Sequence, residues 1–143
     1  MDEDTDELLT CVRRELLPVI ASYGLAVVDR EESTAVDYEG VVLQGQDVRV
    51  RILRDRGQVF VDFGSVCKPG VWFDSAVVMD FLGVSSDAGF HSSRVSEVLR
   101  GLVNFLRSFW TELSNVFSVA QYVKVERELT ALRDTRAAKR LGF

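Results

Sequence analysis

The sequence has few of the residues on which metal and redox sites depend: one histidine and two cysteines in 143 residues. Cys11 and Cys67 form no Cys-x-x-Cys motif, and no acidic residue lies within three positions of His91. Zinc sites and redox pairs need such clusters. We therefore expect no metal site, and we expect both cysteines to be buried free thiols.

Glycine-rich phosphate loops are also missing. The chain has no Gly-x-Gly-x-x-Gly or Gly-Lys-Ser/Thr run, so we expect no nucleotide cofactor. Ser92 and Ser93 follow the histidine, and both are residues that commonly cap helices. Their surroundings do not resemble the strained turn of a serine nucleophile. We expect no catalytic residue, no cofactor of any kind and no enzymatic activity.

Long apolar runs are absent, since none approaches the roughly 20 residues of a membrane-spanning helix. Residues 1–4 are acidic except for the initial methionine, whereas a signal peptide begins with basic residues. We therefore expect a cytoplasmic protein without membrane contact. Prolines number only two, and 47% of the residues are hydrophobic, which is typical of a folded chain. We expect residues 1–143 to form a single domain.

The clearest pattern that is present lies in residues 48–63, where apolar and polar side chains alternate with the two-residue period of a strand. The alternation breaks at residues 55–57, which predicts a hairpin turn centred on Arg56 and Gly57. This turn sets three pairs of cross-strand neighbours: Val50 with Phe63, Ile52 with Val61, and Arg51 with Asp62. One face of the hairpin is then apolar, and the other carries Arg49, Arg51, Leu53, Phe60 and Asp62.

A second hairpin precedes the first. A turn at Gly45 and Gln46 predicts that Leu43 faces Val48 and that Val41 faces Val50. Both hairpins place their apolar residues on the same face, which supports an antiparallel meander. The four expected strands are 25–32, 36–44, 48–54 and 58–66.

Apolar residues at three- and four-residue spacing predict helices over 6–22, 74–82 and 94–117. A last helix uses Tyr122, Val125, Leu129 and Leu132 as its apolar positions, and residues 84–93 are expected to be a loop. The order predicts an α+β fold: an N-terminal helix, a four-stranded antiparallel meander, a short helix and two long C-terminal helices. We expect helices to cover the apolar face of the sheet, and helix packing over the arginine-bearing face as well.

Charge is unevenly distributed along the chain. Residues 1–47 contain 12 acidic and 3 basic residues, whereas residues 48–143 contain 10 acidic and 14 basic ones, and the net charge is −5. Five acidic residues cluster on and between the first two strands: Asp29, Glu31, Glu32, Asp37 and Glu39. They either protect an edge hairpin from sheet aggregation or bind lysines and arginines of a protein partner. They are the candidate partner-binding residues.

Basic residues gather in two places. Arg49, Arg51, Arg54 and Arg56 could line a platform for single-stranded nucleic acid. However, Arg51 is matched by Asp62 and the protein is acidic, so we do not expect a nucleic-acid partner. The basic residues between 133 and 140 suit the negative end of a helix dipole, and that segment is too poor in apolar residues for a membrane-surface helix.

The segment from Arg49 to Phe63 has an arginine-rich strand, an Asp55-Arg56-Gly57-Gln58 turn and a Val-Phe-Val-Asp-Phe strand. It resembles a pattern in small acidic bacterial proteins, some of which are similar to immunity proteins of polymorphic or contact-dependent toxin systems. The resemblance covers mainly residues 6–82 in the order of elements and assigns no functional residue. It implies a non-enzymatic protein that neutralises a toxin by direct binding, and the acidic residues would suit a basic toxin. A small acidic chaperone or adaptor for a secreted effector, for which a homodimer would be expected, and a regulatory domain stay open as alternatives.

Overall fold

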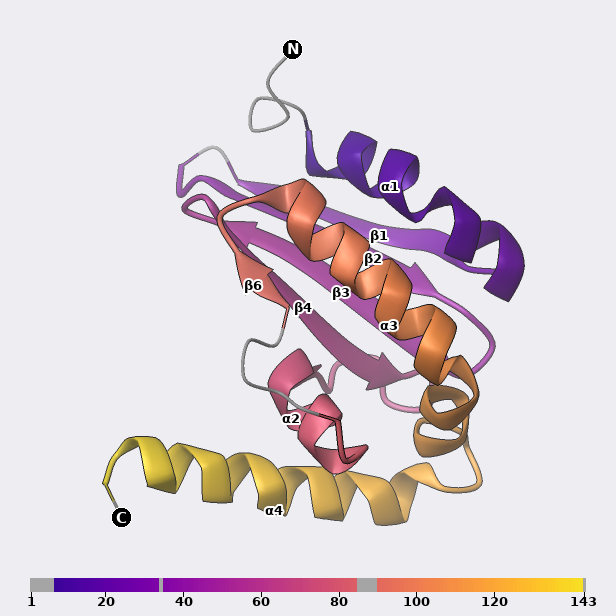
Figure 1. Cartoon of the computed structure of the whole chain (residues 1–143), viewed down its shortest axis with the longest axis vertical. Coiled ribbons are helices and arrows are strands. Elements are labelled where there is room, and N and C mark those ends of the chain that lie inside the picture. Colours follow the sequence, from indigo (N-terminus) through magenta and orange to yellow (C-terminus); the bar gives the residue numbers. More distant parts are fainter. Residues whose placement is uncertain (1–6, 34, 85–89, 143) are drawn as a thin grey trace.

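The computed structural model describes residues 7–33, 35–84 and 90–142, and it has an α+β fold as predicted (Figure 1). The helices are α1 (Leu8–Tyr23), α2 (Ser75–Phe81), α3 (Val95–Val116) and α4 (Tyr122–Arg140). The strands are β1 (Ala26–Ser33), β2 (Tyr38–Gln44), β3 (Val48–Asp55), β4 (Gln58–Ser65), β5 (Phe73–Asp74) and β6 (His91–Ser92). Residue 6, where the first helix was expected to begin, lies outside the described residues.

The four long strands form the predicted antiparallel meander, in the order β1-β2-β3-β4. The two short strands β5 and β6 both pair with the remaining edge of β4. Strand β6 lies in the segment that we expected to be a loop. Two residues are too few to show a strand period, so this pairing left no pattern in the sequence.

The register between β3 and β4 is the predicted one, with Val50 opposite Phe63 and Arg51 opposite Asp62. The turn residues Arg56 and Gly57 have φ angles of 53° and 80°. Two successive residues with positive φ are typical of the tight hairpin turn whose twist matches that of the strands. The turn and the side-chain alternation therefore specify the same register.

The register between β2 and β3 differs from the prediction by two residues: Leu43 lies opposite Val50, not Val48. The turn centres on residues 46 and 47, and the Gly45 N–H donates to the Val48 carbonyl at 2.9 Å. The predicted pairing was therefore wrong. Because an even shift leaves every side chain on its own face, the assignment of core residues was unaffected.

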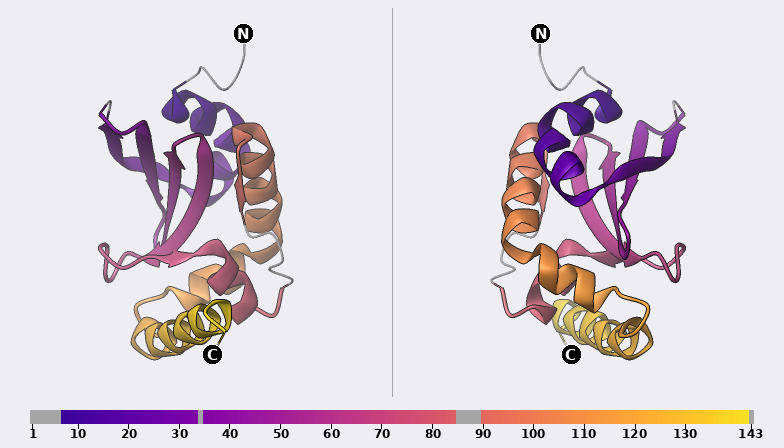
Figure 2. Two further views of the ribbon diagram at one scale, coloured as in Figure 1. Left: turned by 90° about the vertical axis from the view of Figure 1, so that its left-hand side faces the viewer. Right: turned by 90° about the vertical axis from the view of Figure 1, so that its right-hand side faces the viewer.

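Helices α1 and α3 lie on one face of the sheet (Figure 2). The side chains between them and the strands are almost completely buried, and they include the apolar sheet residues Val41, Leu43, Val48, Val50, Ile52, Val61 and Phe63. Helix α3 contributes Val98, Leu99, Leu102 and Leu106, and α1 contributes Leu8, Val12, Leu16 and Val19. This layer is the hydrophobic core that the sequence pattern predicted.

The other face of the sheet has no helix over it among the described residues (Figure 2), so the expectation that a helix packs on the arginine-bearing side was wrong. Helix α4 lies across the end of the sheet and packs on α2 (Figures 1 and 2). Only Tyr122, Val125 and Leu129 of α4 are buried. Three buried positions are too few to cover a sheet face, and we call the uncovered side the open face.

Candidate partner-binding face

The open face is formed by the residues that alternate with the core positions along each strand. On β2, β3 and β4 these are Tyr38, Gly40, Val42, Gln44, Arg49, Arg51, Leu53, Asp55, Gln58, Phe60, Asp62 and Gly64. Trp72, in the loop that precedes β5, also lies here, because its ring would meet a Cβ atom added to Gly64 at 3.2 Å. The face therefore combines aromatic, aliphatic and charged side chains.

A β-bulge in β1 divides the predicted acidic residues between the two faces. Val27 pairs with Leu43 and Asp29 pairs with Val42, so Val28 is the extra residue. A bulge of one residue reverses the side to which the following residues point. Asp29 and Glu31 consequently lie on the open face, whereas Glu32 lies on the helix face.

Glu39 lies on the helix face and takes part in the fold. Its Oε2 accepts a hydrogen bond of 2.9 Å from the backbone N–H of Leu8 at the start of α1, and its Oε1 lies 2.5 Å from Nη2 of Arg54. Burial raises the pKa of Glu39, but the bonds from Arg54 and Leu8 outweigh this effect and hold the pKa below its ordinary value. No pattern in the sequence indicates this internal role of Glu39.

Glu32 lies on the helix face, and Asp37 lies outside the paired strands. Glu32 is 2.9 Å from Nη2 of Arg30, which also lies 3.1 Å from Glu7. Asp37 is in the turn between β1 and β2 with a φ of 30°, and its carbonyl accepts a hydrogen bond from the N–H of Arg56. Of the five candidates, the structure brings only Asp29 and Glu31 together on the open face.

These two acidic residues have no cationic partner in the described part of the chain. Oδ1 of Asp29 accepts a hydrogen bond from the N–H of Arg30 at 2.8 Å. Oε2 of Glu31 accepts one from the hydroxyl of Tyr38 at 2.9 Å. Both carboxylates are exposed, and neither takes part in an ion pair with another described residue.

The arginines of the open face, by contrast, bind groups within the chain. Nε and Nη2 of Arg51 lie 3.0 and 2.6 Å from Oδ2 of Asp62. Burial raises the pKa of Asp62 above its ordinary value, and Arg51 only partly offsets this. Arg49 donates to the side chain of Gln44 and to the carbonyl of Pro69.

Trp72 joins these arginines to the loop. The guanidinium carbons of Arg49 and Arg51 lie 5.1 and 4.6 Å from the centre of its ring, within the range of cation–π attraction. A Cβ atom at Gly64 would lie 2.7 Å from the Val71 carbonyl oxygen, so this position needs glycine for the loop to pack on β4. The contacts fix the position of Trp72, a role that no pattern in the sequence indicates.

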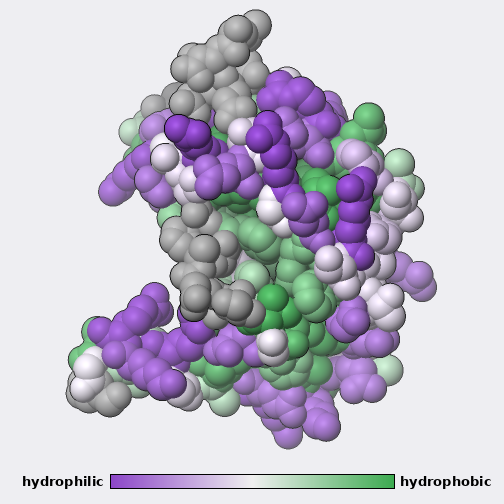
Figure 3. All heavy atoms as spheres, in the orientation of Figure 1, coloured by the Kyte–Doolittle hydropathy of each residue, from purple (hydrophilic) through white to green (hydrophobic). Residues whose placement is uncertain are grey.

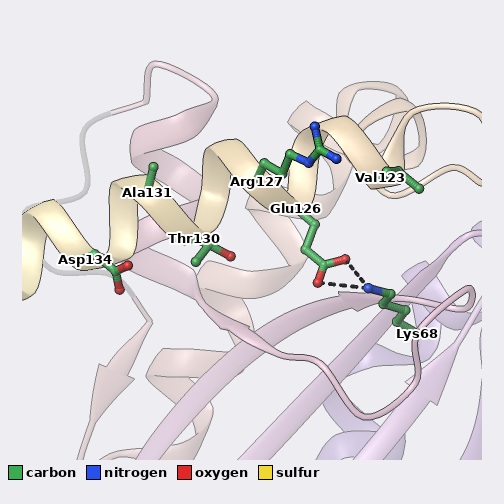
Figure 4. Close-up of a pocket in the computed structure, with 7 residues that line it drawn as sticks. All are labelled: Lys68, Val123, Glu126, Arg127, Thr130, Ala131 and Asp134. Atoms are coloured by element: carbon green, nitrogen blue, oxygen red, sulfur yellow. Dashed lines mark hydrogen bonds and ion pairs between the residues drawn. The ribbon is translucent and has the colours of Figure 1, made fainter.

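A hollow of about 520 Å³ lies between this loop and α4 (Figure 4). Glu126 points from α4 toward Lys68, and their charged atoms are 2.9 Å apart. The rest of the lining comes from α4: Val123, Arg127, Thr130, Ala131 and Asp134. Because Lys68 and Glu126 neutralise each other, the hollow has no strong preference for a ligand of either charge.

The helix side of the molecule is mostly polar over α1 and the C-terminal half of α4, whereas apolar side chains gather around α2 and the neighbouring part of α3 (Figure 3). We place no site there.

The cysteines are both free, but only Cys11 is buried. Cys67 is exposed in the turn after β4, so the expectation that it is buried was wrong; its N–H donates to the Ser65 side chain. Among residues 7–33, 35–84 and 90–142, no three or more metal-binding side chains come together. In the same ranges no helix has the length and apolar character to span a bilayer.

Comparison of the chain with protein-family models, with curated proteins and with solved structures finds no match. Only the geometry of the described residues therefore bears on function, and the open face is the surface to which we assign one.

Proposed function

We propose that this chain is a non-enzymatic protein-binding module that neutralises a cognate toxin by direct binding, as immunity proteins do. The open face is the contact surface. One observation carries the proposal: the sheet face over which no helix of the described residues lies presents Tyr38, Leu53, Phe60 and Trp72. Aromatic residues and arginine are the types enriched at the centres of protein interfaces.

The apolar part of this face is accessible. Phe60 is 38% exposed, and Tyr38, Leu53 and Trp72 are half-buried. A sheet face of this kind suits a standard interface, which covers roughly 800 Å² on each partner. Burial of these side chains under a partner would supply the hydrophobic contribution to binding.

The contact residues are also held in place before binding. Arg51 is fixed by Asp62, and Trp72 is fixed by Gly64 and the two arginines. Side chains that are already ordered lose little conformational entropy when a partner binds. This preorganisation favours a tight complex, which a neutraliser of a toxin requires.

The test is co-expression with the protein encoded by the neighbouring gene, followed by measurement of growth and of the dissociation constant. We expect wild type to restore growth, and we expect Phe60→Arg to weaken binding by about 2 kcal/mol or more, because it places a charge among the contact residues. Trp72→Ala should weaken it similarly. Leu17→Ala is the control, since Leu17 is 61% exposed on α1, on the opposite side of the sheet, and it should bind as wild type does.

Two results would contradict the proposal. One is failure of the wild-type chain to bind or neutralise that protein. The other is unchanged binding by folded Phe60→Arg and Trp72→Ala variants. Light scattering measures the oligomeric state. A monomer that forms a one-to-one complex fits an immunity protein. A dimer that dissociates when Phe60 is replaced would favour the chaperone alternative.

A further inference from the structure

We infer that the partner surface that covers the open face is basic, and that its lysine or arginine side chains contact Asp29 and Glu31 at the β1–β2 end of that face. This inference rests on the proposed function, because it names the chemistry of the partner at the same surface. It assigns the contact to two of the five clustered acidic residues. The other three are excluded by their positions.

The two carboxylates lie on the same side of the sheet. The bulge at Val28 places Asp29 and Glu31 on the open face, opposite Val42 and Gly40. The Tyr38 hydroxyl holds the Glu31 carboxylate in place through a hydrogen bond of 2.9 Å. Two negative charges are therefore presented side by side, on the same side of the sheet as the aromatic contact residues.

The charged side chains of the open face differ in whether the chain itself supplies a partner of opposite charge. Arg51 is paired with Asp62, and Arg49 is bound to Gln44 and Pro69. Arg51 is thus neutralised by a carboxylate, and Arg49 keeps its charge but lies opposite Gln44, toward the other end of the face. Asp29 and Glu31 have no cationic partner among the described residues. The charge left for a partner to meet at this end is negative.

The free energy of covering the two carboxylates depends on the charge of the partner surface. A carboxylate that loses water without gaining a counter-charge is strongly disfavoured. An apolar or acidic partner surface would impose this cost at both positions. A basic surface would neutralise the charges, and its long-range attraction would also accelerate association.

Protection of the sheet edge is the competing explanation, because β1 is an edge strand and charges on edge strands block aggregation. The two explanations predict different effects when lysine replaces the acidic residues. Lysine protects an edge as well as an acidic residue does, so Asp29→Lys with Glu31→Lys preserves edge protection. The same double substitution reverses the complementarity to a basic partner.

The experiment measures association of the D29K/E31K variant with the protein encoded by the neighbouring gene, at low and high salt. Its control is E97K/E112K, which makes the same change in net charge on α3. Both control residues are exposed, and α3 lies on the helix side of the sheet. We expect D29K/E31K to associate about tenfold more slowly at low salt and to lose most of the salt dependence, while the control changes less than about twofold.

The outcomes separate this inference from the proposed function. Equal slowing of both double variants, or no slowing of D29K/E31K, overturns the inference. If Phe60→Arg abolishes binding while D29K/E31K binds at the wild-type rate, the proposed function stands and the inference fails. If no open-face variant alters binding, the proposed contact surface fails.

A second experiment tests the inference without the natural partner. The ¹⁵N-labelled chain is titrated with octalysine, and amide shifts are followed at Asp29 and Glu31 and at the control positions Glu97 and Glu112. The inference requires the larger shifts, and their loss at high salt, at the first two positions. Equal shifts at the control positions would contradict it.

Discussion

At the scale of single residues, Glu39 holds together parts of the chain that are distant in sequence. Its carboxylate accepts a hydrogen bond from Leu8 at the start of α1 and pairs with Arg54 on the neighbouring strand β3. Only 23% of the Glu39 side chain and 13% of the Arg54 side chain are exposed. The pair therefore lies where water screens charges less than at the surface, and α1 is attached to the sheet through it.

We predict that Glu39→Gln lowers the free energy of unfolding at pH 7 by about 1 kcal/mol, because a charged hydrogen bond is replaced by a neutral one. The pKa of Glu39 is lower in the folded protein than its ordinary value. Its stabilisation is therefore full above the unfolded pKa and is lost as pH falls through the folded pKa. The difference between wild type and the variant should shrink as pH falls from 7 to about 3.

Urea unfolding of both proteins across this pH range provides the measurement. The raised pKa of Asp62 makes its own contribution change in the opposite direction, but Asp62 is present in both proteins and cancels in the difference. Glu32→Gln is the matched control, because its side chain is 50% exposed in the pair with Arg30 and exposed pairs contribute little. A pH-independent difference for Glu39→Gln would show that its charge does not stabilise the fold.

At the scale of elements, the β3–β4 hairpin depends on the backbone of its turn. Gly57 has a φ of 80°, and a Cβ added there would meet no atom within 4 Å. Replacement by alanine would therefore strain the backbone without a steric clash. We predict that Gly57→Ala lowers the free energy of unfolding by about 1 kcal/mol or more.

Gly70→Ala is the control for the Gly57 substitution. A Cβ at Gly70 also meets nothing within 4 Å, and its φ is not in the left-handed region. It should change the free energy of unfolding by no more than about 0.5 kcal/mol. Equal effects of the two substitutions, measured by urea unfolding, would mean that the conformation of the turn contributes nothing specific.

The hairpins also show how far the sequence predicts this fold. The β3–β4 register was predictable because one turn satisfied both the Arg56-Gly57 chemistry and every apolar pair. For β2–β3, turns one residue apart give pairings that differ by two residues and keep every side chain on the same face, so alternation alone could not choose between them.

The bulge in β1 was not predictable, and the division of the acidic candidates depended on it. Residues 29–32 are all charged, so no apolar alternation marks which side each one faces. The exposure of the open face could not be predicted from the sequence either. It depends on α4 packing on α2 instead of the sheet, and that choice is made by tertiary contacts of three buried side chains.

At the scale of the whole molecule, charge is divided between two ends. The acidic β1–β2 hairpin lies at the end of the sheet away from α4 (Figure 1), and the last part of α4 carries Arg133, Arg136, Lys139 and Arg140. The proposed interface lies on the open face near the acidic end. The basic end of α4 contacts α2 through a surface ion pair, in which Arg136 is 3.3 Å from Asp80. It contacts β5 through Arg133, which is 5.4 Å from the centre of the buried Phe73 ring.

We predict that deletion of residues 133–143 changes the free energy of unfolding by no more than about 1–2 kcal/mol, because exposed ion pairs and cation–π contacts each contribute little. Leu129→Ala should cost more, about 2–5 kcal/mol, since Leu129 is completely buried. Urea unfolding measures the free energy of unfolding of both variants.

The truncated chain should also bind the protein encoded by the neighbouring gene with unchanged affinity, because the open face is intact. Loss of binding by a folded truncated chain would instead place the interface at the basic end of α4, and the partner would then have to present an acidic surface.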